Sequence, residues 1–232
     1  FLSPHHNIRT DKWGGSAENR RRFVLEVYKS IRENVGKDFP VSIKLNSADF
    51  QKGGFIEEES LDVIRALAGA GIDLTEISGG TYEAPIMTGI RQKESTRQRE
   101  AYFMDFAEKA RKVCTTPMAV TGGFRTTEGM AQAISSGAVD FVGIARIMAI
   151  ETDAPKRYLN GEATKHTVKP IKTGIPMVDK MGLMEISWYS MQLKRLGKGL
   201  PSKPNEPAIW ALIKIAIHQL GLNKRLPQRL RM

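Results

Sequence analysis

Two glycine-rich turns beside arginines are the residues of this chain whose types and spacing favour chemistry. The first, TGGFR, covers residues 121–125, and the second, GIAR, covers residues 143–146. Glycine lets the backbone approach an anion closely, and arginine adds charge and a planar set of N–H donors. The two turns together predict one phosphate site. Its residues are Gly122, Gly123, Arg125, Ala145 and Arg146.

A double glycine by itself more often makes a plain turn, so the prediction depends on the pairing of the two turns. Each turn follows a short apolar run, and a helical pattern follows the first. Phosphate binds where the backbone N–H groups of such loops and of helix N-termini converge.

Lys44 is a second candidate functional residue, because it is a charged residue in the middle of the apolar run VSIKLN. A lysine in such a position needs a partner. One interpretation is a salt bridge in the interior of the fold. The spacing of the remaining residues predicts no metal site and no serine or cysteine nucleophile. Cys114, the single cysteine, is read as a buried and inert thiol in a reducing compartment.

The elements that position these residues alternate along the chain. Strands are predicted at 40–46, 72–78, 117–121 and 139–145. Helices precede the first of them, from a cap at Ser16 to Gly36, and lie between the others. The alternation predicts parallel βαβ units and an α/β fold. From about residue 150 only helices are predicted, around 184–196 and 209–220. The second is amphipathic and either packs on the domain or lies on a membrane surface.

Composition sets wider limits. The 232 residues are 41% hydrophobic and 26% charged, enough for one sizeable core. No apolar run reaches the roughly 18 residues of a membrane-spanning helix. The net charge of +10 is partly in the tail, for example at Lys224 and Arg229. We read it as a solvated basic surface, since no zinc-finger or RNA-binding motif supports nucleic acid as the partner.

A longer motif near the N-terminus resembles a known family. Its residues are Asn7, Arg9, Asp11, Trp13, Gly14, Gly15, Ser16, Glu18, Asn19 and Arg20. This pattern is similar to the signature of the Old Yellow Enzyme family of NADH:flavin oxidoreductases. VSIKLN, the ISGG turn, REAYF, the two glycine turns and SWYSMQLKRLGKG follow in the family's order.

The resemblance implies an FMN-binding (β/α)8 TIM-type barrel that passes hydride from NAD(P)H through the flavin to an activated alkene such as an enone. By position, Gly123, Ala145 and Arg146 would hold the FMN phosphate, with Gly122 and Arg125 beside them. Lys44 falls where the family has an arginine near flavin N1, and Ala145 replaces a glycine. The family resemblance also places Ser78, Gly79, Gly80 and Tyr82 where they line the flavin or substrate or form a plain turn.

The chain supplies about four βα units where a whole barrel needs eight. We therefore expect the C-terminal half of the barrel at 1–160 and a helical extension at 161–232. The family's substrate-binding pair would precede this chain, so no catalytic residue is assigned, and His5 and His6 are read as loop residues. We expect a cytoplasmic protein, inactive alone, that dimerises or pairs with a separate first half. The alternative is a non-catalytic half-barrel that acts as a binding or scaffold protein.

Overall fold

The computed structural model describes residues 1–81, 100–166, 168–179 and 183–219. The chain divides into two compact units, Phe1–Ile144 and Ala145–Met232, and each is described by itself. The expected division at residue 160, between barrel and extension, stays a prediction. Tyr82 and the basic residues after 220 lie outside the described residues.

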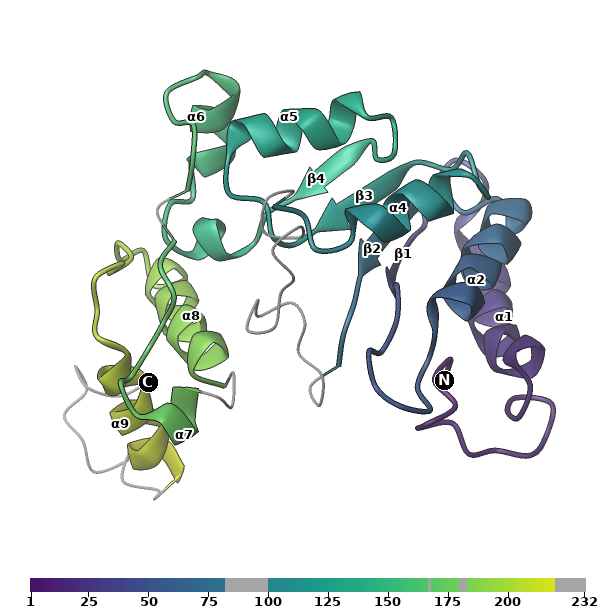
Figure 1. Cartoon of the computed structure of the whole chain (residues 1–232), viewed down its shortest axis with the longest axis horizontal. Coiled ribbons are helices and arrows are strands. Elements are labelled where there is room, and N and C mark those ends of the chain that lie inside the picture. Colours follow the sequence, from purple (N-terminus) through teal and green to yellow (C-terminus); the bar gives the residue numbers. More distant parts are fainter. Residues whose placement is uncertain (82–99, 167, 180–182, 220–232) are drawn as a thin grey trace. The chain divides into compact units, whose positions relative to one another are not determined.

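Four parallel strands form the sheet of the first unit (Figure 1). They are β1 (Ser42–Asn46), β2 (Leu74–Ser78), β3 (Met118–Thr121) and β4 (Phe141–Gly143). The four predicted strands are confirmed, each slightly shorter than expected. They lie side by side in chain order. This order is that of a (β/α) barrel, since the order of a doubly wound sheet reverses at its switch point.

Helices precede or follow these strands, and local signals define their ends. They are α1 (Ala17–Val35), α2 (Glu57–Ala70), α4 (Met104–Arg111) and α5 (Thr127–Ser135). The Ser16 hydroxyl accepts a hydrogen bond from Asn19 N at 3.2 Å and so caps α1, as predicted. Thr126 caps α5 in the same way through Gly129 N. Gly71 ends α2 in the left-handed conformation.

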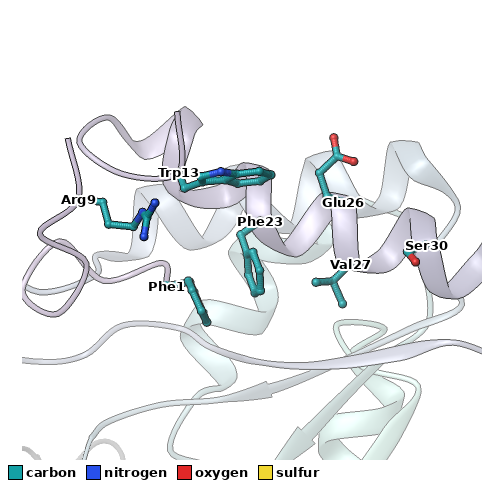
Figure 2. Close-up of a pocket in the computed structure, with 7 residues that line it drawn as sticks. All are labelled: Phe1, Arg9, Trp13, Phe23, Glu26, Val27 and Ser30. Atoms are coloured by element: carbon teal, nitrogen blue, oxygen red, sulfur yellow. The ribbon is translucent and has the colours of Figure 1, made fainter. Parts of the chain in front are cut away.

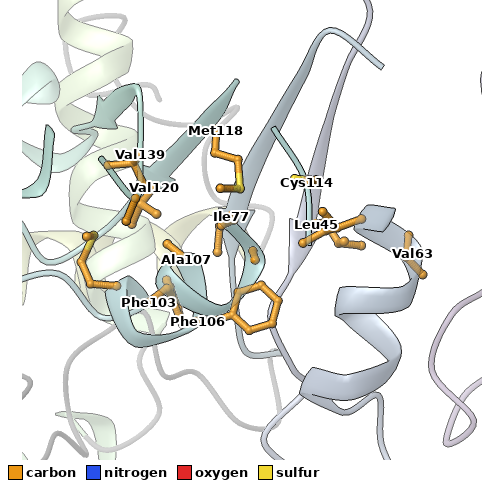
Figure 3. Packing of buried hydrophobic residues seen from close by; sticks show 14 of the residues in the cluster. Leu45, Val63, Ile77, Phe103, Phe106, Ala107, Cys114, Met118, Val120 and Val139 are labelled. Atoms are coloured by element: carbon orange, nitrogen blue, oxygen red, sulfur yellow. The ribbon is translucent and has the colours of Figure 1, made fainter. Parts of the chain in front are cut away.

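One face of the sheet and the inner faces of these helices form a single hydrophobic core (Figure 3). Strand residues Leu45, Ile77 and Val120 are buried against Val63 of α2 and Ala107 of α4. Alternation along a strand sends the next residues to the opposite face. There the register aligns Lys44 of β1, Glu76 of β2, Ala119 of β3 and Phe141 of β4.

Cys114 belongs to this core and is 8% exposed. Burial raises the pKa of its thiol, more than the backbone hydrogen bond from Thr116 lowers it. A thiol with a raised pKa carries little reactive thiolate at neutral pH. The predicted buried thiol is thus confirmed.

The N-terminal loop packs on α1 through the residues of the family-like motif. Asn7 donates hydrogen bonds to the carbonyl oxygens of Phe1 and Trp13, both at 2.8 Å. Phe1 stacks on Phe23 of α1, with ring centroids 4.0 Å apart. A surface pocket of about 410 Å³ lies between this loop and the helix, and Figure 2 shows the residues that line it. Asn7 of the motif therefore fixes the loop.

The second unit is helical in its described residues. It contains the 3₁₀ helix η2 (Arg146–Ala149) and the helices α6 (Ala154–Leu159), α7 (Pro176–Asp179), α8 (Leu183–Leu196) and α9 (Ala208–Gln219). The two long helices were predicted, and they pack on each other around Trp188, which is 1% exposed. The short helices η2, α6 and α7 carry too few residues for a recognisable periodicity.

The segment between α8 and α9 is fixed by buried polar groups. Gln192 is fully buried, accepts a hydrogen bond from Lys203 N and donates one to Glu206. Trp188 Nε1 donates to the carbonyl oxygen of Glu206 at 2.8 Å.

Among the described helices, none is long and apolar enough to cross a membrane.

Candidate phosphate-binding site

The first glycine turn joins β3 to α5. Gly122 has φ 112° and Gly123 has φ 96°, a region that side-chain-bearing residues rarely adopt. A Cβ atom on Gly123 would lie 1.9 Å from the carbonyl oxygen of Glu100 and 2.9 Å from the Tyr102 ring. Close packing of segment 100–102 over the turn therefore requires glycine at 123, whatever ligand the turn binds.

The Glu100 side chain occupies the N-terminus of α5. Its Oε2 accepts hydrogen bonds from Arg125 N at 2.9 Å, Thr126 N at 2.8 Å and the Thr126 hydroxyl at 3.0 Å. A carboxylate is favoured there by the free N–H groups and the helix dipole. The backbone donors of Arg125 and Thr126 thus bind an anion of the chain itself, and the Arg125 side chain is exposed.

The second turn follows β4 and begins the second unit. Ala145 occupies the N-cap position of η2 without a capping side chain, and Arg146 is the first residue of that helix. Arg146 Nη1 donates to Glu185 Oε2 of α8 at 3.5 Å, with the two side chains 32% and 20% exposed. Gly122, Gly123 and Arg125 belong to the first unit. The structure describes the two turns separately, so their joint site stays a proposal.

Lys44 forms a salt bridge on the face of the sheet opposite to the core. Its Nζ donates to Glu76 Oε1 at 2.6 Å, and the Thr121 hydroxyl donates to the same oxygen at 2.7 Å. Burial raises the pKa of Glu76, but the hydrogen bonds from Lys44 and Thr121 outweigh it and bring the pKa below its ordinary value. The carboxylate thus connects Lys44 to Thr121, the residue immediately before the double glycine.

The chain matches a known family over most of its length. Residues 1–164 match the NADH:flavin oxidoreductase / NADH oxidase family. This chain belongs to that family. The match contains both glycine turns and the N-terminal motif, and it confirms the resemblance to the Old Yellow Enzyme family.

Proteins with named activities are similar to this chain. An NADH-dependent flavin oxidoreductase of Hypocrea jecorina is 35% identical over 199 residues, which cover 81% of this chain and 49% of that protein. A multifunctional alkene reductase/demethylase of Caballeronia cordobensis is 30% identical over 147 residues, 63% of this chain and 21% of that protein. The chain thus spans about half, or less, of the length of these relatives.

A solved structure supports the fold. The 2-naphthoyl-CoA reductase in complex with 2-naphthoyl-CoA is 29% identical, with a TM-score of 0.64 over 78% of this chain and 27% of that protein. Together with the chain-ordered parallel sheet, this confirms the predicted fold class, part of an α/β barrel of the Old Yellow Enzyme type.

The turn after β2, at residues 78–80, is tightly packed. Asn46 Nδ2 donates to the carbonyl oxygen of Gly80 at 2.9 Å. A Cβ atom on Gly79 would lie 2.4 Å from the Phe103 ring and 2.9 Å from the Ser47 hydroxyl. These contacts support a structural role for the turn at 78–80. Its contact with flavin or substrate stays a prediction.

Sequence reasoning missed several acids beside the predicted site. Glu76 had a usable signal, because it is a charged residue in the middle of an apolar strand, as Lys44 is. Glu100 and Glu185 carry no local signal. They become relevant only through contacts with Arg125 and Arg146, which lie 25 and 39 positions away in the chain.

Proposed function

We propose that this chain is the FMN-binding part of an oxidoreductase that transfers hydride from NAD(P)H to an activated alkene such as an enone. The observation that carries the proposal is the family match over residues 1–164, which spans both glycine turns. The flavin oxidoreductase and the alkene reductase among the similar proteins support it.

The donor set of the two turns fits the phosphate of FMN. Arg146 has a half-buried guanidinium, of which the Glu185 contact uses Nη1. Its Nε and Nη2 donors suit a second anion, because a guanidinium has five N–H groups. The positive φ of Gly122 and Gly123 and their lack of side chains suit close approach of a phosphate oxygen to the backbone N–H groups. Arg125 is assigned an outer, charge-supplying role, since its backbone donor already binds Glu100.

FMN supplies hydride transfer at its ring when bound. In the proposed arrangement, the Lys44 ammonium would lie near flavin N1 and favour negative charge there. Glu76 and Thr121 hold Lys44 in place through the shared carboxylate oxygen. Lys44 keeps the positive charge of the family's arginine but lacks its planar fork.

The open edges of the sheet bear on the assembly of the protein. In the described residues β1 and β4 are the edges of the sheet, and Phe141 on β4 is 55% exposed. Such edges and an exposed sheet face favour pairing with further strands. We propose that a second copy or a separate barrel half supplies them, that the 232 residues alone do not turn over, that the substrate is a small molecule and that the protein is cytoplasmic.

Titration of the purified chain with FMN, followed by flavin fluorescence, tests the proposal. We expect binding by the unchanged chain and an affinity about tenfold or more lower in Arg146→Ala, as for loss of a charged hydrogen bond. Arg65→Ala, which removes an exposed arginine of α2, is the control and should bind as the unchanged chain does. A chain that binds no FMN contradicts the proposal and favours a non-catalytic binding or scaffold role.

A further inference from the structure

A buried tyrosine hydroxyl in the second unit has no partner among the described residues. Tyr189 of α8 is 8% exposed, and its Oη lies within hydrogen-bonding distance of no described donor or acceptor. Buried polar groups in proteins are nearly always hydrogen-bonded, so an unpartnered hydroxyl is an indication of a missing ligand. The Tyr189 ring packs edge-on against Trp188, with centroids 5.1 Å apart, which fixes its direction.

Tyr189 lies on the same helix as Glu185, which contacts the arginine of the proposed phosphate site. Glu185 and Tyr189 are four residues apart on α8, so they share one face of that helix. Glu185 on this face contacts Arg146 at 3.5 Å. The charges of Arg146 and Glu185 also influence the pKa of the Tyr189 hydroxyl. Burial raises the pKa of Tyr189 to about 12, which Arg146 opposes and Glu185 reinforces. The hydroxyl is therefore a neutral donor at physiological pH.

The three side chains form an arrangement suited to a phosphate monoester. Phosphate oxygens are acceptors only, so they bind the Arg146 guanidinium and a neutral phenol but not a carboxylate. Glu185 is itself an acceptor and so can act only through Arg146, by holding the Nη1 edge of the guanidinium.

We propose that Tyr189 is a further ligand of the FMN phosphate, donating a hydrogen bond from Oη beside Arg146, and that Glu185 is a positioning residue for Arg146. This inference rests on the proposed function. It assigns α8 a direct part in cofactor binding, although α8 lies beyond the residues 1–164 that match the family.

Tyr189→Phe tests the inference because it removes one oxygen and keeps the ring in the core. A residue with only a packing role would tolerate this change, and loss of an unpartnered buried hydroxyl would leave stability equal or higher. As an FMN ligand, Tyr189 loses a hydrogen bond to a charged group, and we expect FMN to bind about tenfold more weakly. Tyr158→Phe is the matched control, because its hydroxyl is also buried without a described partner.

The measurement is a fluorescence titration of the full chain with FMN and, separately, with riboflavin, which lacks the phosphate. The expected result is weaker FMN binding in Tyr189→Phe alone, equal riboflavin binding in all three proteins and unchanged thermal stability. Equal FMN affinity of Tyr189→Phe and the unchanged chain overturns this inference and leaves the proposed function standing. An equal loss for riboflavin also overturns it, by showing a general structural effect. Absence of FMN binding by the unchanged chain overturns the proposed function and this inference together.

Discussion

At the scale of single residues, the first glycine turn requires glycine at position 123 for two separate reasons. Gly123 has a positive φ, and its missing side chain also makes room for the carbonyl oxygen of Glu100. Gly137, after α5, has φ 73° with no atom within 4 Å of the Cβ position. Both glycines therefore have a positive φ, but only Gly123 has another segment packed closely against its Cα.

This difference predicts the effects of two alanine substitutions. Both should cost about 1–2 kcal/mol of unfolding free energy for the left-handed backbone. Gly123→Ala should cost about 1–3 kcal/mol more, because its methyl group overlaps a backbone atom that must move. Urea denaturation of both variants measures the difference. Equal losses would show that segment 100–102 moves away freely.

Glu100 places its own carboxylate at the N-terminus of α5. It has φ 59°, unusual for a residue with a side chain, and its carboxylate accepts three hydrogen bonds at the start of α5. These bonds extend the cap of α5 beyond Thr126. In the proposed phosphate site, the backbone contact is therefore assigned to the glycines of the turn rather than to the helix N-terminus.

At the scale of elements, a repeated contact joins the beginnings of neighbouring strands. Asp140 precedes β4 and accepts hydrogen bonds from Met118 N, where β3 starts, and from Arg111 at the end of α4. Arg111 also donates to the carbonyl oxygens of Thr116 and Ala138. One ion pair thus fixes the end of a helix and the starts of two strands.

The same arrangement recurs at β1 and β2. Asp73 precedes β2 and accepts from Val41 N, just before β1, at 2.7 Å. Its second donor is Arg32 in the last turn of α1, which also donates to the carbonyl oxygen of Phe39. The repetition follows from the βα unit, which returns each helix end to the start of the next strand.

Asp140→Asn should lower the stability of the first unit in a pH-dependent way. The hydrogen bond from Met118 N lowers the pKa of Asp140, burial opposes this, and Arg111 adds to the lowering. A carboxyl with a lowered folded pKa stabilises the fold fully above its unfolded pKa of about 3.9, and this is lost as pH falls through the folded value. We expect a loss of about 1 kcal/mol at pH 7, reduced for the partial exposure of the pair.

Urea unfolding at pH 7 and at decreasing pH below 4 measures this effect. The difference between Asp140→Asn and the unchanged chain should narrow as Asp140 becomes protonated. Asp38→Asn, in an exposed loop, is the control and should show no such difference. A loss that stays constant down to acid pH would show that the carboxylate charge is not its source.

At the scale of the whole molecule, the described residues form two hydrophobic clusters. The first lies between the sheet and its helices, and the second lies between α8, α9 and the segment after β4. Trp188 is the largest fully buried side chain of the second cluster. Each unit therefore has a core of its own.

Trp188→Ala should destabilise the second unit by about 3–5 kcal/mol, the usual cost of truncating a buried tryptophan. We expect the amides of α8 and α9 to lose hydrogen-exchange protection, while those of α2 and α4 keep it. Trp210→Ala is the control, since that side chain is 50% exposed. Equal loss of protection in α2 and α4 would show that the two cores unfold as one.

Local patterns predicted the elements of this fold well. The four strands, the cap at Ser16 and the helix end at Gly36 depend on residues only a few positions apart. Hydrophobic periodicity and capping are short-range effects, so the sequence carries them directly. The side chains that surround the candidate site could not be predicted in this way.

The sequence alone determined the family, the alternation of strands and helices, and the two glycine turns with their arginines, because each is written in contiguous residues. Only the tertiary structure decided which groups those residues meet. Glu76 faces Lys44 across 32 positions, and Glu100 meets the first turn across 25. Such partners depend on strand register and on how segments pack, and many distant carboxylates in the chain could equally have filled the same roles.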